Sequence, residues 1–318
     1  MEVIENGELR VEISELGAEM QSLTDLATGR NLLWTGDAAY WQGRSPVLFP
    51  AVGALWNGTY RKGGRSYDMS KHGFVRRILW ELSERTTDSI TFAHEQTADE
   101  AAVFPWPYRV EVEYRLQGRK VCVAFRVHNA GSETMYFQIG GHPGFSLPDF
   151  EPDKAVSGYI RFEEQPDYIL RVAEQGCTVV AEVSRDNSAA GIENVHYLVP
   201  ADENGLVPVC ADTFANEALI FPDRQISAAA LLRTDGTPIV RISSSAPVWL
   251  FWMPVNSGLC QNPEANKTVL KAAPFVCFEP WYGLCDPIGF DGDVGQRPFI
   301  NALAPDEVWR GGYEILVY

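Results

Sequence analysis

Four short segments of the 318-residue sequence each set a polar side chain among glycine, proline and aromatic residues. They are GRSPVLFP (43–50), KHGFVR (71–76), GGHPGF (140–145) and FEPWYGLCD (278–286). Segments of this composition suit loops where the backbone comes close to a ligand. A carboxylate and histidines in such loops can exchange protons with a bound molecule near neutral pH, so general acid–base chemistry is the first candidate.

Glu279 is the strongest single candidate among these residues. Strand alternation over residues 275–279 places its side chain on the face shared by Phe275 and Cys277. A carboxylate on an apolar face needs a reason, which favours a functional acid over an exposed acid at a strand end. His142 and His72 each allow two interpretations, a turn histidine that bonds its own loop or a catalytic group.

Motifs for metals and nucleotides do not occur in the sequence. The five histidines, at positions 72, 94, 128, 142 and 196, lack HxH and HExxH spacing, and the six cysteines form no CxxC pair. GxGxxG, GxxxxGK[ST] and GxSxG are also absent. We therefore expect neither a bound metal nor a cofactor, and we expect the cysteines to be reduced thiols.

The charge balance narrows the class of partner. The chain carries 42 acidic against 26 basic residues, a formal net charge of -16. Its longest basic groupings, Arg76-Arg77 and Arg61-Lys62, are too short for a nucleic-acid footprint, so we expect no nucleic-acid partner. A neutral or weakly charged small molecule is favoured instead.

Targeting and membrane signals are also missing. The sequence has no long apolar run, and acidic residues stand in MEVIENGELRVEIS where a secretory signal needs a basic and then an apolar stretch. These features predict a cytoplasmic protein with no membrane partner.

The elements that must position the candidate residues are predominantly strands. Apolar and polar residues alternate in ELRVEIS (8–14), YRVEVEYRL (108–116) and KVCVAFRVHN (120–129), as expected for antiparallel strands with one buried face. Further β-rich runs occupy 89–94, 134–141, 159–162, 178–183, 217–221, 239–243, 248–253, 274–281 and 313–318.

Helices are scarce, and the one stretch of helical composition, ADEAAVF (98–104), runs into Pro105. Long helices do not alternate with the strands, which excludes a Rossmann fold or a TIM barrel. No linker or repeat divides the chain. We predict an all-β fold in a single domain spanning residues 1–318.

Taken in order, the segments resemble the aldose 1-epimerase (mutarotase) family, most closely its bacterial LacX-like branch. The resemblance starts at NGELRVEISELGAEMQSL, runs through GRSPVLFPAVGAL, KHGFVR, GGHPGFSLP and EALIF, and closes with APFVCFEPWYGLCD. It implies a large antiparallel β-supersandwich like that of galactose mutarotase. It also implies cofactor-free interconversion of the α and β anomers of a free hexose, by a protein that is a monomer or a homodimer.

The resemblance also implies roles for individual residues. Glu279 matches the catalytic base of the family, His142 its acid, and His72 the second histidine, which holds the sugar near its ring oxygen. Mutarotation needs a base on the anomeric hydroxyl and an acid on the ring oxygen. With ordinary pKa values of about 4.3 and about 6.5, an ionised Glu279 and a protonated His142 would need only modest tuning.

Further matches concern sugar binding. Arg44 in GRSPVLFP matches the sugar-binding arginine of the family. A further acid that contacts hydroxyls matches Asp212, with Glu217 as the fallback. Trp281 is a candidate for stacking on the sugar, although a core position is the commoner use of a tryptophan.

Three alternatives remain open. GGHPGF departs from the histidine segment of the galactose mutarotases, so a hexose-6-phosphate epimerase is possible, although Arg76 and Arg77 are the only adjacent arginines that suit a phosphate. A carbohydrate-binding protein of the same fold without catalysis is a second alternative. A glycoside hydrolase or lyase is a third, with Asp286 as the other acid of the FEPWYGLCD segment.

Overall fold

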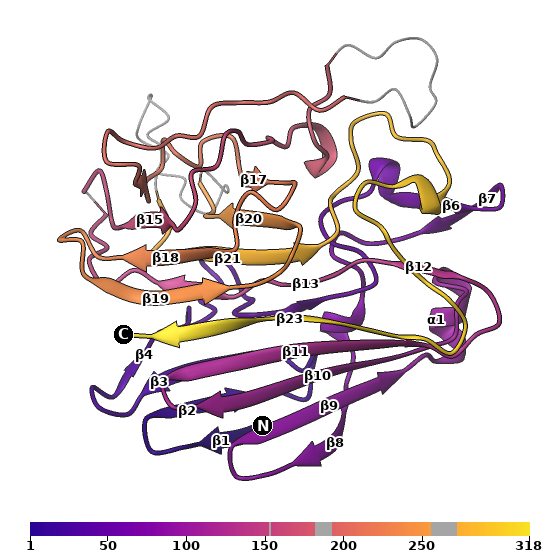
Figure 1. Ribbon diagram of the computed structural model, residues 1–318, viewed down its shortest axis with the longest axis horizontal. Coiled ribbons are helices and arrows are strands. Elements are labelled where there is room, and N and C mark those ends of the chain that lie inside the picture. Colours follow the sequence, from indigo (N-terminus) through magenta and orange to yellow (C-terminus); the bar gives the residue numbers. More distant parts are fainter. Residues whose placement is uncertain (153, 182–192, 256–271) are drawn as a thin grey trace.

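Antiparallel strands make up most of the regular structure in the computed structural model, which describes residues 1–152, 154–181, 193–255 and 272–318 (Figure 1). The largest sheet has nine strands, in the order β16 (Val207–Pro208), β15 (Tyr159–Phe162), β18 (Ala228–Leu232), β19 (Pro238–Ser243), β23 (Val308–Val317), β11 (Lys120–Asn129), β10 (Tyr108–Gln117), β9 (Ser89–Glu95) and β8 (Glu81–Arg85).

A second sheet carries the FEPW segment. Its order is β17 (Leu219–Phe221), β20 (Val248–Trp252), β21 (Phe275–Tyr282), β13 (Ile139–Gly141) and β5 (Val47–Leu48), with β14 (Gly144–Ser146) also paired to β21.

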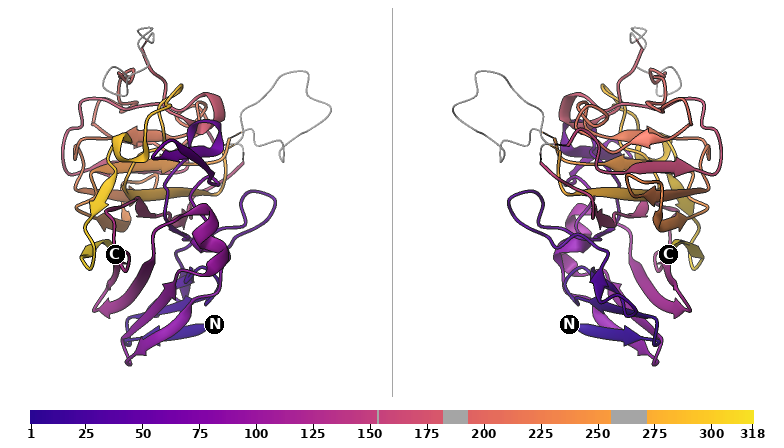
Figure 2. Two further views of the ribbon diagram at one scale, coloured as in Figure 1. Left: turned by 90° about the vertical axis from the view of Figure 1, so that its right-hand side faces the viewer. Right: turned by 90° about the vertical axis from the view of Figure 1, so that its left-hand side faces the viewer.

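The remaining strands form one four-stranded sheet and two two-stranded sheets. These are β1 (Glu2–Glu5), β2 (Leu9–Ile13), β3 (Met20–Asp25) and β4 (Arg30–Asn31), then β6 (Thr59–Lys62) with β7 (Arg65–Asp68), and β12 (Met135–Phe137) with β22 (Asn301–Leu303). The side views of Figure 2 show β1–β4 beside strands β8–β11. The predicted all-β, antiparallel architecture is confirmed.

Helical elements are short. They are α1 (Ala98–Val103) and the 3-10 turns η1 (Trp56–Gly58), η2 (Val75–Arg77), η3 (Glu174–Gly176) and η5 (Val294–Gln296). Thr97 caps α1 in a capping box with Glu100, and the helix ends before Pro105, as its sequence predicts. No helix among the described residues is both long and apolar enough to cross a membrane.

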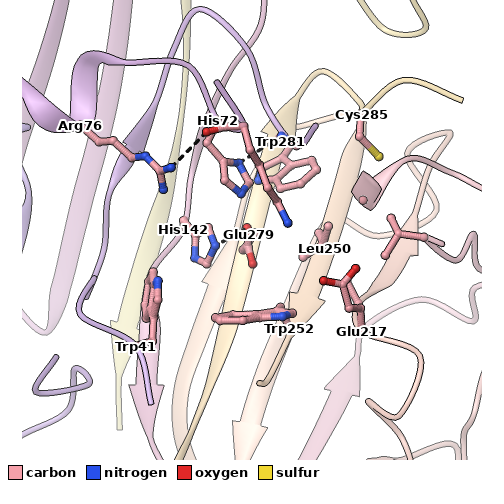
Figure 3. A pocket seen from close by; sticks show the side chains of 15 residues that line it. Trp41, His72, Arg76, His142, Glu217, Leu250, Trp252, Glu279, Trp281 and Cys285 are labelled. Atoms are coloured by element: carbon pink, nitrogen blue, oxygen red, sulfur yellow. Dashed lines mark hydrogen bonds and ion pairs between the residues drawn. The ribbon is translucent and has the colours of Figure 1, made fainter. Parts of the chain in front are cut away.

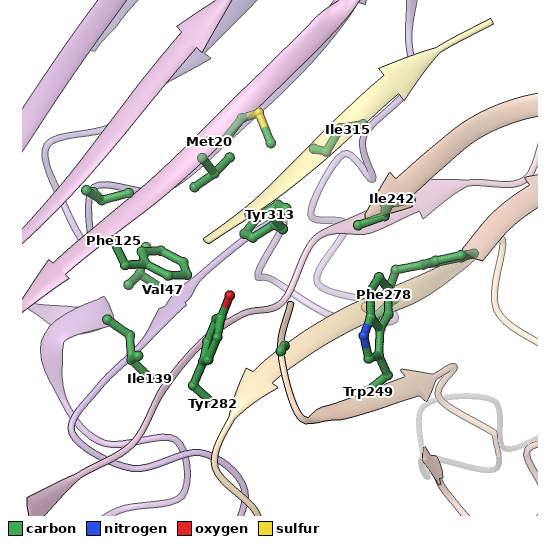
Figure 4. Packing of buried hydrophobic residues seen from close by; sticks show 14 of the residues in the cluster. Met20, Val47, Phe125, Ile139, Ile242, Trp249, Phe278, Tyr282, Tyr313 and Ile315 are labelled. Atoms are coloured by element: carbon green, nitrogen blue, oxygen red, sulfur yellow. The ribbon is translucent and has the colours of Figure 1, made fainter. Parts of the chain in front are cut away.

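The core lies between the nine-stranded sheet and the other sheets. Along β11 every second residue is buried, and the inward residues face those of β10 in a continuous antiparallel register. Tyr313 and Ile315 of β23 pack in the same core as Phe278 and Tyr282 of β21 (Figure 4). Alternate residues of β21 therefore point away from this core, toward the face where the site is built.

Two β-rich runs differ from the expected single strands. Residues 134–141 divide into β12 and β13 because Gln138 turns its buried side chain to the loops, accepting from the Val52 N–H at 3.2 Å and donating to the Leu284 carbonyl at 2.9 Å. In the run 178–183, Thr178 and Val180 make only isolated bridges, and positions 182 and 183 lie outside the described residues.

Candidate active site

A pocket of about 230 Å³ lies on the face of β21 that points away from the core (Figure 3). Its polar lining residues are Lys71, His72, Arg76, His142, Glu217 and Glu279. Its other lining residues are Trp41, Gly53, Val172, Gly176, Ala218, Leu250, Trp252, Trp281 and Cys285. We call this the Glu279 pocket.

Glu279 sits at the base of the pocket, where β21 pairs with Leu250 of β20. Only 1% of the residue is exposed, and neither carboxylate oxygen has a hydrogen-bond partner within the described part of the chain. The Nε2 atom of His142 lies 3.1 Å from Oε2, too poorly aligned to count as a hydrogen bond. The carboxylate is therefore free to accept a proton or hydrogen bond from a molecule in the pocket.

The two glycines of GGHPGF position His142. A Cβ atom on Gly140 would lie 2.7 Å from the Trp281 ring, and one on Gly141 would lie 2.4 Å from the Tyr313 ring. Side chains at both positions are excluded, so β13 can approach β21 closely and end with His142 beside Glu279. Trp41 stacks on the His142 imidazole with ring centroids 4.8 Å apart and fixes its plane.

His72 approaches from the loop before η2, with a left-handed backbone φ of 67°. Its Nδ1 accepts a hydrogen bond from the Gly53 N–H at 3.1 Å. Since an accepting Nδ1 carries no proton, this bond selects the neutral tautomer with the proton on Nε2. His72 therefore offers a hydrogen-bond donor, and its ring meets that of His142 edge-on at 5.5 Å.

Burial shifts the pKa values of these groups in opposite directions. It raises the pKa of Glu279 well above its ordinary value, while the charges of Lys71 and Arg76 act against that rise. It lowers the pKa of His142, and the same two cations lower it further. Burial and His142 lower the pKa of His72 as well. The sequence led us to expect only small pKa shifts for Glu279 and His142, whereas burial shifts both pKa values strongly.

Several buried polar atoms of the pocket are unsatisfied. The Trp281 indole N–H, the Nε of Arg76 and the Nδ1 of His142 have no hydrogen-bond partner among the residues described, like both oxygens of Glu279. Unpaired buried polar groups are costly and uncommon in folded proteins, so their concentration here points to a polar ligand. The predicted Trp281 lies in this group.

The structure brings together four of the sequence candidates: Glu279, His142, His72 and Trp281 all line the pocket. Asp212 is exposed and does not line it, whereas Glu217, the fallback, does. Glu217 extends from a backbone with φ of 65° just before β17.

Arg44 also lies outside the lining residues. Its guanidinium donates to Gln21 Oε1 at 2.6 Å and its backbone N–H to Glu19 Oε1 at 2.7 Å. Asp286, the second acid weighed for a hydrolase, is buried and bonded to Arg297 Nε at 2.6 Å. Neither side chain reaches the pocket in this arrangement.

Sequence reasoning considered Arg76 only as a possible phosphate ligand and gave Lys71 no role. Lys71 and Arg76 belong to the KHGFVR segment that supplied His72, and they place two cations at the pocket of an acidic protein. The aromatic walls Trp41 and Trp252 were also missed. Alternation along 248–252 puts Trp252 and Leu250 on one face, but only the pairing of β20 with β21 shows that this face carries Glu279.

Comparisons with known proteins give the family and the fold to which this chain is similar. A family model described as aldose 1-epimerase matches residues 2–283. Protein LacX of Lactococcus lactis subsp. lactis is 26% identical over 324 residues, covering 99% of this chain and 98% of that protein.

Solved structures match over the full length. A galactose mutarotase related enzyme from Lactobacillus acidophilus superposes with a TM-score of 0.82 at 27% identity, covering 100% of this chain and 97% of that one. A galactose mutarotase-like protein from Lactobacillus casei gives a TM-score of 0.83 at 26% identity, covering 100% of both chains. The predicted galactose mutarotase-like sandwich is confirmed.

Proposed function

This chain belongs to the aldose 1-epimerase family, and on that premise we propose that it interconverts the α and β anomers of an aldose. The observation that carries the proposal is the pair formed by Glu279 and His142, buried together 3.1 Å apart at the base of a pocket. Both carboxylate oxygens of Glu279 and the Nδ1 of His142 have no hydrogen-bond partner among the described residues, as expected of acid–base groups in a pocket without bound substrate.

In the proposed reaction Glu279 takes the proton of the anomeric hydroxyl while His142 protonates the ring oxygen. The C1–O5 bond breaks, the C1–C2 bond of the open aldehyde rotates, and the ring closes on the other face of the carbonyl. In closure Glu279 returns its proton to the new anomeric oxygen, and His142 recovers its proton from the O5 hydroxyl. Both residues regain their starting states, so no cofactor is needed. His72, with its proton on Nε2, donates a hydrogen bond to the sugar near the ring oxygen.

The rest of the pocket suits a pyranose. Trp41, Trp252 and Trp281 offer apolar surface for the C–H faces of the ring, and the Trp281 N–H is a free donor for a hydroxyl. Glu217 is placed to accept from hydroxyls at the mouth, which favours it over Asp212 as the sugar-binding acid. For Arg44, direct sugar contact requires its guanidinium to leave Gln21.

Polarimetry on freshly dissolved α-D-glucose and α-D-galactose tests the proposal. The protein should accelerate the approach to the equilibrium rotation in proportion to its concentration. A protein that binds these sugars, by calorimetry, without any acceleration would support the alternative of a carbohydrate-binding protein without catalysis.

Lys71 and Arg76 support a second candidate substrate class, aldoses that carry a phosphate. The net charge of the whole chain favours a neutral sugar, but both cations line the pocket itself. Arg76 donates to the Lys71 carbonyl oxygen at 3.0 Å, while its Nε has no partner in the described residues. A guanidinium with free N–H groups is a strong phosphate ligand.

Rates on glucose and glucose 6-phosphate distinguish the two classes. If the phosphate is recognised, kcat/KM should favour glucose 6-phosphate, and Arg76→Gln should lower that preference by about 10- to 100-fold, the loss of a charged hydrogen bond. Arg77→Gln is the matched control, since the neighbouring arginine does not line the pocket. An equal or higher kcat/KM on glucose, unaffected by Arg76→Gln, would show that the substrate is a neutral sugar.

A further inference from the structure

Three metal-ligating side chains converge at the base of the Glu279 pocket. Ligand atoms of His142, Cys277 and Glu279 all lie within 4.8 Å of one another, and all three residues are buried. Cys277 and Glu279 are two positions apart on β21 and therefore share a face, and His142 follows β13, which pairs with β21. Strand alternation pairs Cys277 with Glu279, but sequence spacing gives no sign of His142 as the third member because it comes from a distant segment.

Two members of the group have unused lone pairs. Both oxygens of Glu279 have no hydrogen-bond partner among the described residues, and His142 Nε2 lies 3.1 Å from Oε2 without a well-aligned hydrogen bond, although Glu279 is 1% and His142 6% exposed. Figure 3 shows the two side chains facing each other across the base of the pocket. A buried, electron-rich cluster of this kind is suited to a cation.

The donor set matches zinc in chemistry. Imidazole nitrogen, thiolate sulfur and carboxylate oxygen are its usual ligands, with bonds of about 2.0–2.3 Å, so neighbouring donors of a tetrahedral site lie about 3.3–3.7 Å apart. The separation of 3.1 Å between His142 Nε2 and Glu279 Oε2 is already near that range. The fourth position would face the pocket and take water.

We propose that His142, Cys277 and Glu279 together bind Zn²⁺, and that the bound ion blocks the active site reversibly. On binding, the Cys277 thiol releases its proton to solvent as the S–Zn bond forms. The proton held between His142 and Glu279 is also released, so that a neutral imidazole nitrogen and a carboxylate oxygen donate lone pairs to the ion without a change of oxidation state. Both acid–base groups are then unavailable for proton exchange. Zinc binding stands on the geometry alone, and only the inhibition rests on the proposed mutarotation.

Cobalt(II) substitution tests the binding without any activity measurement. Titration of the whole protein with CoCl₂ should produce an intense near-ultraviolet thiolate-to-cobalt band and the visible bands of a tetrahedral site. Cys277→Ala and Cys277→Ser should both lose the thiolate band, and folding of each variant is checked by circular dichroism. Cys122→Ser, which removes a partly exposed thiol on β11, should keep it.

The inhibition is measured with ZnCl₂ against each variant's own metal-free rate. Zinc should inhibit the wild-type protein and EDTA should restore it, while Cys277→Ala should raise the inhibitory zinc concentration at least tenfold. Absence of a thiolate band in the wild type, or its persistence without Cys277, would overturn the site. If the protein has no mutarotase activity, the cobalt spectrum still decides the metal site, so the two proposals fail separately.

Discussion

At the scale of single residues, the proposed reaction requires one proton on the pair formed by Glu279 and His142. Adding a second proton places a positive charge on a buried imidazole, and removing the shared proton leaves a buried negative carboxylate. Burial opposes both changes, consistent with the lowered pKa of His142 and the raised pKa of Glu279. Because the two side chains lie 3.1 Å apart, we expect them to titrate as a pair in the proposed reaction.

We expect a broad bell-shaped pH profile for kcat/KM. The acid limb lies below the ordinary histidine pKa because burial lowers the pKa of His142, and the alkaline limb lies above the ordinary carboxyl pKa because burial raises that of Glu279. His142→Gln should cut the rate by roughly 10²–10⁴, and the residual rate should only rise with pH as the Glu279 base ionises, without an alkaline fall.

His128→Gln is the control for this profile, because His128 is half-exposed on β11 outside the pocket. Its profile should match that of the wild type. If His142→Gln keeps the full rate and both limbs while His72→Gln loses them, the roles of the two histidines are exchanged.

The Gly53 N–H bond to Nδ1 predicts the protonation state of His72. We expect ¹⁵N NMR of the imidazole to show the neutral tautomer protonated on Nε2 throughout about pH 5–8, since burial also lowers the pKa of this histidine. Signals of an imidazolium within that range would contradict a fixed hydrogen-bond donor.

Sequence alone could predict the residues whose role follows from local pattern. Alternation along β21 placed Glu279 on the correct face, and the segment order supplied His142 and His72 through the family resemblance. The choice between Asp212 and Glu217 depends on how the chain turns before β17, which alternation does not encode. The hydrogen bond between Arg44 and Gln21 on β3 likewise joins residues of two different segments, so no local sequence pattern predicts it.

At the scale of elements, a buried ion pair anchors the loops around the pocket. Asp286 accepts from Arg297 Nε at 2.6 Å and from the Trp56 N–H at 3.0 Å, and its own N–H donates to the Ala54 carbonyl at 3.0 Å. The adjacent Gly53 holds His72. The pair thus joins the segment after β21 to the loop that orients a candidate active-site histidine.

Arg297→Leu should destabilise the protein strongly. Only 5% of Arg297 and 1% of Asp286 is exposed, so the substitution leaves an unpaired buried carboxylate, which costs about 3–5 kcal/mol. Urea unfolding measures this change. Arg10→Ala, which removes the exposed ion pair with Glu12, should cost no more than about 1 kcal/mol. Equal losses in the two variants would contradict the anchoring role.

Strands were predicted correctly where the alternation of apolar and polar residues extends over the whole strand, as in β10 and β11. The prediction failed where the hydrogen bonds of a buried polar side chain interrupt a strand. Gln138 breaks a β-rich run because its buried amide needs partners in two loops. Nothing in the run itself reveals those partners, which lie 86 and 146 positions away.

At the scale of the whole molecule, charge and topology have different consequences. The net charge of -16 describes the surface as a whole, whereas Lys71 and Arg76 set the local field at the pocket. The charge of the substrate therefore depends on these two local cations as well as on the net charge, and the rates on glucose and glucose 6-phosphate decide it. Topology joins distant parts of the chain, since the last strand, β23, pairs with both β11 and β19 in the large sheet.

This pairing leads us to expect a single cooperative unfolding transition, in keeping with the prediction of one domain. Tryptophan fluorescence and far-ultraviolet circular dichroism should give coincident urea curves. Curves with separate midpoints would show that two parts of the chain unfold independently.

The rate of mutarotation by Glu279→Gln tests the central claim most directly. The amide keeps the size of the side chain but cannot act as the base. The mutarotation rate of the variant, measured by polarimetry, should therefore be about 10²–10⁴ lower than that of the wild type. Sugar affinity, measured by calorimetry, should stay within about tenfold. A Glu279→Gln protein with near-wild-type turnover would contradict acid–base catalysis at this pocket.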